Sequence, residues 1–232
     1  MSRVDPVVSR LGDSALLLRW STGDVAARNA QVHRVAAALA HVRPLWLLDL
    51  VPAFASLALI IDPATDAGAM DTAESWLSQH LLTVRASEEE RPNPRCVEIP
   101  VCYALAFGSD LADIAEACRM TIDEVVVRHC APTYRVVMLG FAPGFPYLMG
   151  LDPALAMARL AAPRIRVEAG SVGIGGDQTG VYPRTSAGGW RLVGRTPLNL
   201  FDPQRDPPSL LCAGDKLRFV AIDRDCFDAW PA

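Results

Sequence analysis

Lysine is almost absent from this sequence, with Lys216 the only one among 22 basic residues. The arginines that make up the rest are scattered along the chain, and the formal net charge is -4. A protein that binds nucleic acid needs a basic patch to neutralise phosphates. Because no such cluster exists in the sequence, we expect no nucleic-acid partner.

Long apolar runs and closely spaced cysteine pairs are missing too. The longest apolar stretch, 45–61, is interrupted by Asp49, Pro52 and Ser56, so it is not expected to span a membrane. The first residues lack the apolar core of a signal peptide. The six cysteines are dispersed without a CxxC pair, which argues against a zinc site. We therefore expect a cytoplasmic protein with free thiols, no membrane partner and no metal.

The N-terminal part alternates between strand-like and helix-like patterns. Apolar residues recur at helical spacing after residue 25 and again after residue 66 or 71. The expected elements are a strand at 16–20, a helix from 25 to Pro44, strands at 45–50 and 56–61, and a second helix. This β-α-β-β-α order predicts a ferredoxin-like α+β domain over residues 1–84.

Residues 85–95, with the sequence RASEEERPNPR, interrupt this pattern. They combine a run of charges with two prolines and show no apolar periodicity. We interpret them as a linker that separates residues 1–84 from a second domain over residues 96–232.

The second part is predicted to be mostly β. A strand at 97–103 is followed by two short helices, and the second helix opens with a capping box formed by Thr121 and Glu124. From Gly140 onward the chain is rich in glycine and proline, with short β-prone pieces and a final strand at 216–222. Many short strands separated by turn residues predict a compact barrel.

The segment GFAPGFPYL, at 140–148, constrains three aromatic side chains between glycines and prolines. Proline fixes φ, and glycine permits conformations that other residues avoid. Phe141, Phe145 and Tyr147 could therefore wall a ligand pocket at little entropic cost. They could equally fill the interior of the barrel.

The segment AGSVGIGGDQTGVYP, at 169–183, has the glycine density of a phosphate-binding loop. It lacks the Gly-Lys-Ser/Thr of a P-loop, but its backbone N–H groups could form an anion-binding nest. Gln178, Thr179 and Tyr182 add polar groups. Spacing alone favours tight turns in a barrel over a binding loop.

Three further residues invite a functional interpretation. Arg195, in SAGGWRLVGRTPLNLFDP, could clamp a carboxylate or phosphate, or form an internal ion pair. Trp190 could pack in the core or face a ligand. His129, at the end of a helix, is more typical of a structural cap than of a base. The sequence shows no Ser-His-Asp, HExxH or paired-carboxylate pattern, so the catalytic residue stays unassigned.

Taken together, four segments resemble the KipI family, also called allophanate hydrolase subunit 1 or the B subunit of 5-oxoprolinase. The similarity extends over nearly the whole chain, and one departure is Glu168, which stands where the family usually has proline. The resemblance implies that the second domain is a cyclophilin-like barrel. The segments are HCAPTYRVVMLGFAPGFPYLMGLD, PRIRVEAGSVGIGGDQTGVYP, SAGGWRLVGRTPLNLFDP and PPSLLCAGDKLRF.

The resemblance also implies a function. It points to one subunit of an ATP-dependent 5-oxoprolinase, which opens 5-oxo-L-proline to L-glutamate. The implied partners are a larger homologous protein, of the type of KipA or the C subunit of 5-oxoprolinase, and a third, lactam-binding subunit. Two alternatives stay open: an inhibitor of a histidine kinase, and a subunit of an allophanate hydrolase or urea carboxylase-like system.

A single pocket for substrate or nucleotide is expected in the second domain. Its lining would combine the aromatic loop, the glycine-rich segment and Arg195, with His129 near the edge. The expected residues are His129, Phe141, Pro143, Phe145, Tyr147, Gly170, Ser171, Gln178, Thr179, Tyr182, Trp190 and Arg195.

Overall fold

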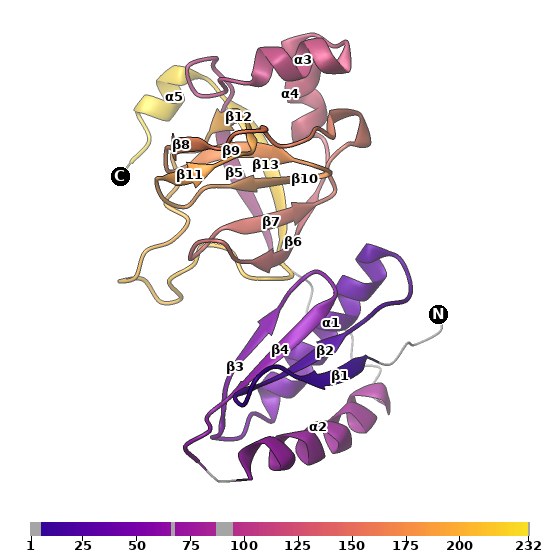
Figure 1. Cartoon of the computed structure of the whole chain (residues 1–232). Coiled ribbons are helices and arrows are strands. Elements are labelled where there is room, and N and C mark those ends of the chain that lie inside the picture. The colour runs from indigo at the N-terminus through magenta and orange to yellow at the C-terminus, as the bar shows by residue number, and fades with distance from the viewer. Residues whose placement is uncertain (1–5, 66–67, 87–94, 232) are drawn as a thin grey trace. The chain divides into compact units, whose positions relative to one another are not determined.

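The computed structural model describes residues 6–65, 68–86 and 95–231, and the chain divides into two compact units (Figure 1). The units are Met1–Asn93 and Pro94–Ala232. Most of the linker expected at 85–95 lies outside the described residues, so its character stays a prediction. Within the described part of the chain, no helix is both long and apolar enough to cross a membrane.

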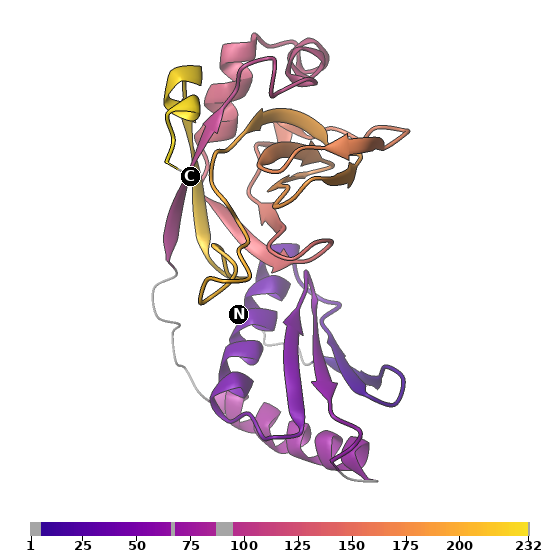
Figure 2. The ribbon, with the colours of Figure 1, turned by 90° about the vertical axis from the view of Figure 1, so that its left-hand side faces the viewer.

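The N-terminal unit is an antiparallel sheet with two helices on one of its faces (Figure 2). Alternate residues of the two central strands, among them Leu16, Leu18 and Leu59, are fully buried against those helices. The strand order in the sheet is β1-β2-β4-β3. The elements are β1 (Val7–Arg10), β2 (Ala15–Arg19), α1 (Val25–His41), β3 (Leu47–Pro52), β4 (Ser56–Ile61) and α2 (Ala69–Ala86).

The expected elements of this unit are present, but a further strand precedes them. Strand β1 was not predicted because its residues do not alternate between buried and exposed: Val7 and Val8 are 58% and 40% exposed at the sheet edge. The resulting order is β-β-α-β-β-α, whereas a ferredoxin-like unit has the order β-α-β-β-α-β. The α+β class is therefore observed, and the ferredoxin-like arrangement is not confirmed.

Seven strands of the second unit close into a barrel, as predicted from the many short strands. Around the barrel the order is β10-β7-β6-β13-β5-β12-β9, with β13 parallel to β5 and the other neighbours antiparallel. Closure leaves no unpaired sheet edge. The strands are β5 (Cys96–Cys102), β6 (Tyr134–Leu139), β7 (Pro146–Met149), β9 (Ser171–Gly175), β10 (Gln178–Val181), β12 (Arg191–Arg195) and β13 (Lys216–Ile222).

Short elements surround the barrel. The predicted capping box is confirmed: Glu124 N donates to the Thr121 hydroxyl (3.2 Å), and Thr121 N donates to the Glu124 carboxylate (2.7 Å). The elements are α3 (Leu111–Cys118), α4 (Ile122–Cys130), the 3-10 helix η1 (Pro153–Leu155), a two-stranded sheet of β8 (Arg164–Val167) and β11 (Ser186–Gly188), and α5 (Arg224–Asp228).

A buried carboxylate ties three of these elements together. The Asp110 side chain, which is 5% exposed, precedes α3 and pairs with the Arg164 guanidinium of β8 at 2.6 Å. Its other oxygen accepts from the backbone N–H of Leu192 in β12, also at 2.6 Å. Asp110 therefore fixes α3 and β8 to the strand that follows Trp190.

Replacing Asp110 should strongly destabilise the barrel unit. Asp110→Ala leaves the Arg164 charge and the Leu192 N–H without their partner, which typically costs about 3–5 kcal/mol. Asp110→Asn keeps an acceptor and should cost less. Urea unfolding measures both. The control is Asp113→Asn on the same helix, an exposed residue 3.9 Å from Arg191, with an expected effect below about 1 kcal/mol. Equal effects at both positions would contradict this role of Asp110.

Candidate functional site

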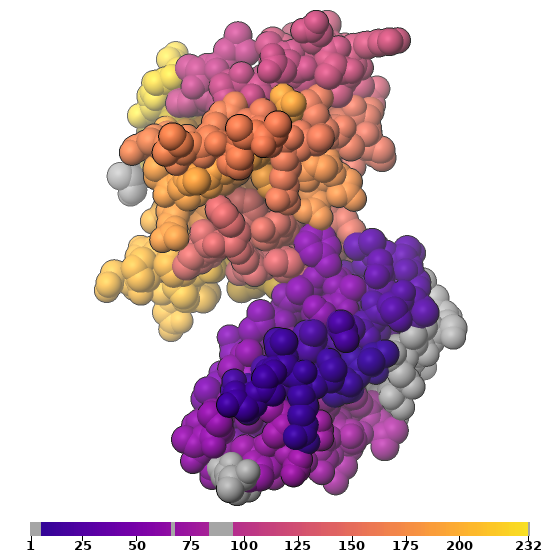
Figure 3. Space-filling model, in the orientation of Figure 1, coloured from indigo at the N-terminus to yellow at the C-terminus, as the bar shows by residue number. Residues whose placement is uncertain are grey.

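The expected site residues all belong to the barrel unit, but they do not line one pocket. Segments that carry many of them form most of the visible face of that unit, coloured salmon to orange (Figure 3). The six expected aromatic and arginine residues divide between two cavities, and others of the expected set lie inside the barrel. The expectation of a single pocket is therefore wrong.

The first cavity, here called the aromatic hollow, measures about 80 Å³. Phe145 contacts three other aromatic residues of the wall. The centre of its ring lies 5.0 Å from that of Tyr147, 5.3 Å from that of Tyr182 and 5.5 Å from that of Trp190. These rings meet in edge-to-face or tilted contacts, an arrangement that holds aromatic groups in defined positions. The lining residues are Phe141, Phe145, Tyr147, Arg159, Tyr182, Gly188, Gly189 and Trp190.

The GFAPGF turn places Phe141 at the rim of the hollow. Phe141 has φ of +66°, a left-handed conformation that costs a non-glycine residue about 1–2 kcal/mol, and its side chain is 63% exposed. Gly144, with φ of +80°, lies so near Phe201 that a Cβ there would come within 2.8 Å. Pro143 is exposed and does not line the hollow. The turn therefore holds Phe141 outward at an energetic cost.

The second cavity, here called the Arg195 cavity, measures about 320 Å³. Arg195 Nε donates to the carbonyl oxygen of Ala169 (2.8 Å), and the guanidinium lies 5.7 and 6.0 Å from the ring centres of Phe107 and Phe227. Its two terminal nitrogens have no hydrogen bond to any described residue. A guanidinium held in this way can pair with an anion. The lining residues are Ala169, Gly170, Pro183, Arg195, Thr196, Pro197, Leu198, Asn199, Phe227, Trp230 and Pro231.

The glycine-rich segment does not form an anion-binding nest at its start. Gly170 N donates to the Tyr182 carbonyl (2.7 Å), and Ser171 N donates to the Glu168 carbonyl (3.2 Å). Gly170 has φ of +81°, and a Cβ there would come within 2.3 Å of the Thr196 carbonyl oxygen. These glycines and amides form turns and allow close packing, as the spacing of the glycines predicted. Gln178, half-buried at the start of β10, lines neither cavity.

His129 lies inside the barrel unit rather than at a pocket edge. Its side chain is fully buried and stacks on Phe219, with Nδ1 2.7 Å from the Tyr103 hydroxyl and Nε2 3.0 Å from the Thr179 hydroxyl. The Thr179 hydroxyl donates its one proton to the Gly173 carbonyl (3.0 Å). It must therefore accept from Nε2–H of His129, which leaves Nδ1 to accept from Tyr103. The imidazole is neutral and fully hydrogen-bonded, as a structural residue requires.

Desolvation by burial lowers the pKa of His129 from its usual 6.5 to about 3, and this makes barrel stability depend on pH. Below pH 6.5 the unfolded chain binds a proton that the folded chain does not bind until about pH 3. Stability should therefore fall as the pH drops through this window, by up to about 1.4 kcal/mol per pH unit. His129→Gln, which cannot titrate, should flatten the dependence in urea unfolding between pH 7 and 5. An equal slope in both proteins would refute this assignment.

Glu168, the departure from the family pattern, lies on the surface beside the Arg195 cavity. Its carboxylate accepts from Arg166 Nε (2.6 Å) and from the Thr185 hydroxyl (3.2 Å). The hydrogen bond from Arg166 lowers the pKa of Glu168, and the charge of Arg195 adds a smaller effect. Glu168 therefore adds a negative charge near this cavity without lining it.

Several lining residues were not predicted from the sequence, among them Arg159 in the aromatic hollow, and Phe227 and Trp230 in the Arg195 cavity. Arg159 follows a stretch without a motif, and the other two belong to the short C-terminal helix and its continuation. No local pattern distinguishes them from ordinary surface residues, because their place depends on the folded barrel.

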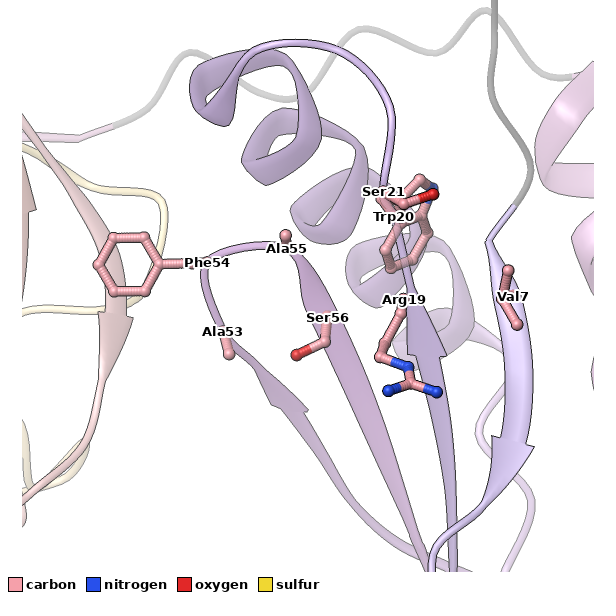
Figure 4. A pocket seen from close by; sticks show the side chains of 8 residues that line it. All are labelled: Val7, Arg19, Trp20, Ser21, Ala53, Phe54, Ala55 and Ser56. Atoms are coloured by element: carbon pink, nitrogen blue, oxygen red, sulfur yellow. The ribbon is translucent and has the colours of Figure 1, made fainter.

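A hollow in the N-terminal unit, of about 520 Å³, is an open groove that contains none of the expected site residues (Figure 4). Arg19 and the buried Trp20 contribute from the end of β2, while the turn between β3 and β4 contributes Phe54, which points away from the other labelled side chains. Its lining is mostly apolar, with Arg19 as its charged group. We assign the candidate site to the barrel unit.

Comparison with known sequences places the chain in a family. The family model of the carboxyltransferase domain, subdomain C and D, matches residues 6–211, and the chain belongs to this family. It is 39% identical to the B subunit of 5-oxoprolinase from Bacillus subtilis (strain 168), with 96% of this chain and 95% of that protein covered. It is 40% identical to the corresponding B subunit from Escherichia coli O157:H7, with coverages of 90% and 93%. These findings confirm the resemblance drawn from the motifs.

Solved structures agree with this placement. TTHA0988 superposes with a TM-score of 0.76 at 38% identity over 90% of this chain, which spans only 40% of that protein. PH0987 from Pyrococcus horikoshii, at 40% identity, gives 0.56 with coverages of 95% and 100%. The Kluyveromyces lactis urea carboxylase gives 0.77 at 18% identity, over 98% of this chain and 23% of that protein. At that identity the likeness concerns the fold alone.

Proposed function

We propose that this chain is the B subunit of an ATP-dependent 5-oxoprolinase that opens 5-oxo-L-proline to L-glutamate in the cytoplasm. The observation that carries the proposal is the near-40% identity to two 5-oxoprolinase B subunits over almost the full length of both partners in each comparison. The relatives are named as subunits, so the chain would act with a larger partner of the C type and a lactam-binding third subunit.

The chemistry of this reaction explains why an anion-binding cavity is needed. An unstrained lactam resists hydrolysis, and transfer of the γ-phosphoryl group of ATP to its oxygen activates the ring carbon while ADP leaves. Water then adds to that carbon, and the C–N bond breaks as the nitrogen gains a proton. A second water converts the resulting acyl phosphate to glutamate and phosphate. Negative charge accumulates throughout, so fixed cationic donors would stabilise it.

The Arg195 cavity suits a phosphate-bearing ligand. Its volume of about 320 Å³ falls at the lower end of the range for small-molecule sites. Arg195 is anchored through Nε to Ala169 and can offer its two terminal nitrogens as a pair of donors. The rings of Phe227 and Trp230 border the same cavity and could cover an apolar or planar part of the ligand. A phosphate of ATP that is not transferred would bind at Arg195.

The complete complex should turn over 5-oxo-L-proline, and this chain alone should not. We expect the chain co-produced with its two partner subunits to release glutamate in a reaction that needs both ATP and 5-oxo-L-proline. Coupled measurement of ADP and glutamate checks this, with each subunit omitted in turn. Turnover by the purified chain alone, or ATP hydrolysis indifferent to 5-oxo-L-proline in the full complex, would contradict the proposal.

Arg195→Ala should weaken nucleotide binding by the complex. Loss of a charge-assisted hydrogen bond costs about 1.5–3 kcal/mol, which corresponds to tenfold or more in affinity. Titration with a non-hydrolysable ATP analogue measures the affinity, and thermal unfolding measures the stability of the same sample. A lowered melting temperature with unchanged affinity would show that Arg195 serves only to hold Ala169 and the rings of Phe107 and Phe227.

A further inference from the structure

The backbone around Arg159 is fixed in place beside the aromatic hollow. Met157 exchanges two hydrogen bonds with Gly176, of 3.0 and 2.8 Å, although the two residues belong to different segments. On the other side, Leu160 N donates to the Gly189 carbonyl (2.8 Å), and Gly189 itself lines the hollow. Arg159 thus lies between two anchored neighbours, so its position does not depend on an ion pair of its own.

The charge of Arg159 is available at the mouth of the hollow. Its guanidinium carbon lies 5.3 Å from the centre of the Trp190 ring, and the residue is exposed. Among the described residues, no carboxylate forms a salt bridge with it. Arg164, also near β12, is by contrast neutralised by buried Asp110. Arg159 can therefore accept an anion that enters from solvent.

The hollow selects for a small ring. About 80 Å³ is far below the roughly 300–1,000 Å³ of sites for drug-sized ligands, so a nucleotide cannot enter. Its size is set by glycines, because a Cβ at Gly188 would come within 2.3 Å of the Tyr182 hydroxyl. The walls are mainly aromatic, and one guanidinium lies at the edge. These properties match a compact ring that carries one carboxylate.

We propose that the aromatic hollow binds the lactam ring of 5-oxo-L-proline and that Arg159 holds its carboxylate. The inference rests on the function proposed above: the hollow would hold the ring while its oxygen is phosphorylated, and the lactam-binding third subunit would act on the activated ring. The ring would lie against Tyr147 and Trp190, with Phe141 covering it from the rim. The carboxylate would pair with the guanidinium of Arg159 through charge-assisted hydrogen bonds.

Two tryptophans allow the two cavities to be told apart, because Trp190 lines the aromatic hollow and Trp230 lines the Arg195 cavity. The full chain, labelled with ¹⁵N at its indole nitrogens, is titrated with 5-oxo-L-proline, and Trp190→Phe and Trp230→Phe assign the two signals. We expect a saturable shift of the Trp190 signal only. Pyrrolidin-2-one, which has the ring without the carboxylate, should bind at least tenfold more weakly.

Arg159→Met is the decisive variant, since methionine can still cover the Trp190 ring but carries no charge. It should weaken 5-oxo-L-proline binding at least tenfold, leave pyrrolidin-2-one binding unchanged, and in the complete complex raise KM for 5-oxo-L-proline but not for ATP. Arg218→Met, at an exposed position on β13, is the matched control and should behave like the original protein.

Three results would overturn the inference: a Trp190 signal that stays unmoved at concentrations that saturate turnover, a ligand shift at Trp230 instead, or an unchanged KM in Arg159→Met. A Trp190 shift produced only by the partner subunits would mean that a partner side chain fills the hollow, and would overturn it too. If the complex instead lacks any turnover dependent on 5-oxo-L-proline, the proposed function fails, while the titration still reports independently whether the hollow takes the ring.

Discussion

The parallel pairing of β13 with β5 is the constraint on which the barrel unit depends. Residues Lys216–Ile222 run beside Cys96–Cys102 in continuous register, so the last strand of the unit lies next to its first. The other side of β13 pairs with β6 through Lys216 and Leu217. Every segment between these strands, including the whole lining of the aromatic hollow, is therefore held within a closed ring. A closed barrel restricts the movement of its loops, which suits sites built from fixed side chains.

Local patterns in the sequence were sufficient where local chemistry decides the structure. The capping box at Thr121 and Glu124 and the strained aromatic turn at Phe141 each depend on a few consecutive residues. The ends of β3 were misplaced by two residues because several apolar residues in a row leave the register ambiguous. Strand β1 was not predicted because an exposed edge strand lacks the alternation of buried and exposed residues that indicates a strand.

The sequence favoured a structural role for His129, but its hydrogen-bonding partners could not be predicted, because they lie far away in the sequence. Tyr103 and Thr179, its two hydrogen-bonding partners, lie 26 and 50 positions from it, and barrel closure alone brings them together. The arginines show the same limit. No sequence motif separates Arg159 from Arg164, yet buried Asp110 neutralises Arg164, whereas Arg159 borders a cavity, as Arg195 does. Only the folded structure shows which arginine forms an internal ion pair and which can bind a ligand.

The position of β13 also shows how much of the chain the barrel requires. The family match ends at residue 211, whereas the strand that closes the barrel begins at Lys216. A protein cut at the end of the match would keep every glycine-rich motif and both segments that carry Arg159 and Arg195. It would nevertheless expose the seam between β5 and β6 as two unpaired edges, which are ready templates for association with other chains. The match to the family model is thus shorter than the closed barrel, although the similarity to the Bacillus subtilis B subunit covers 96% of this chain.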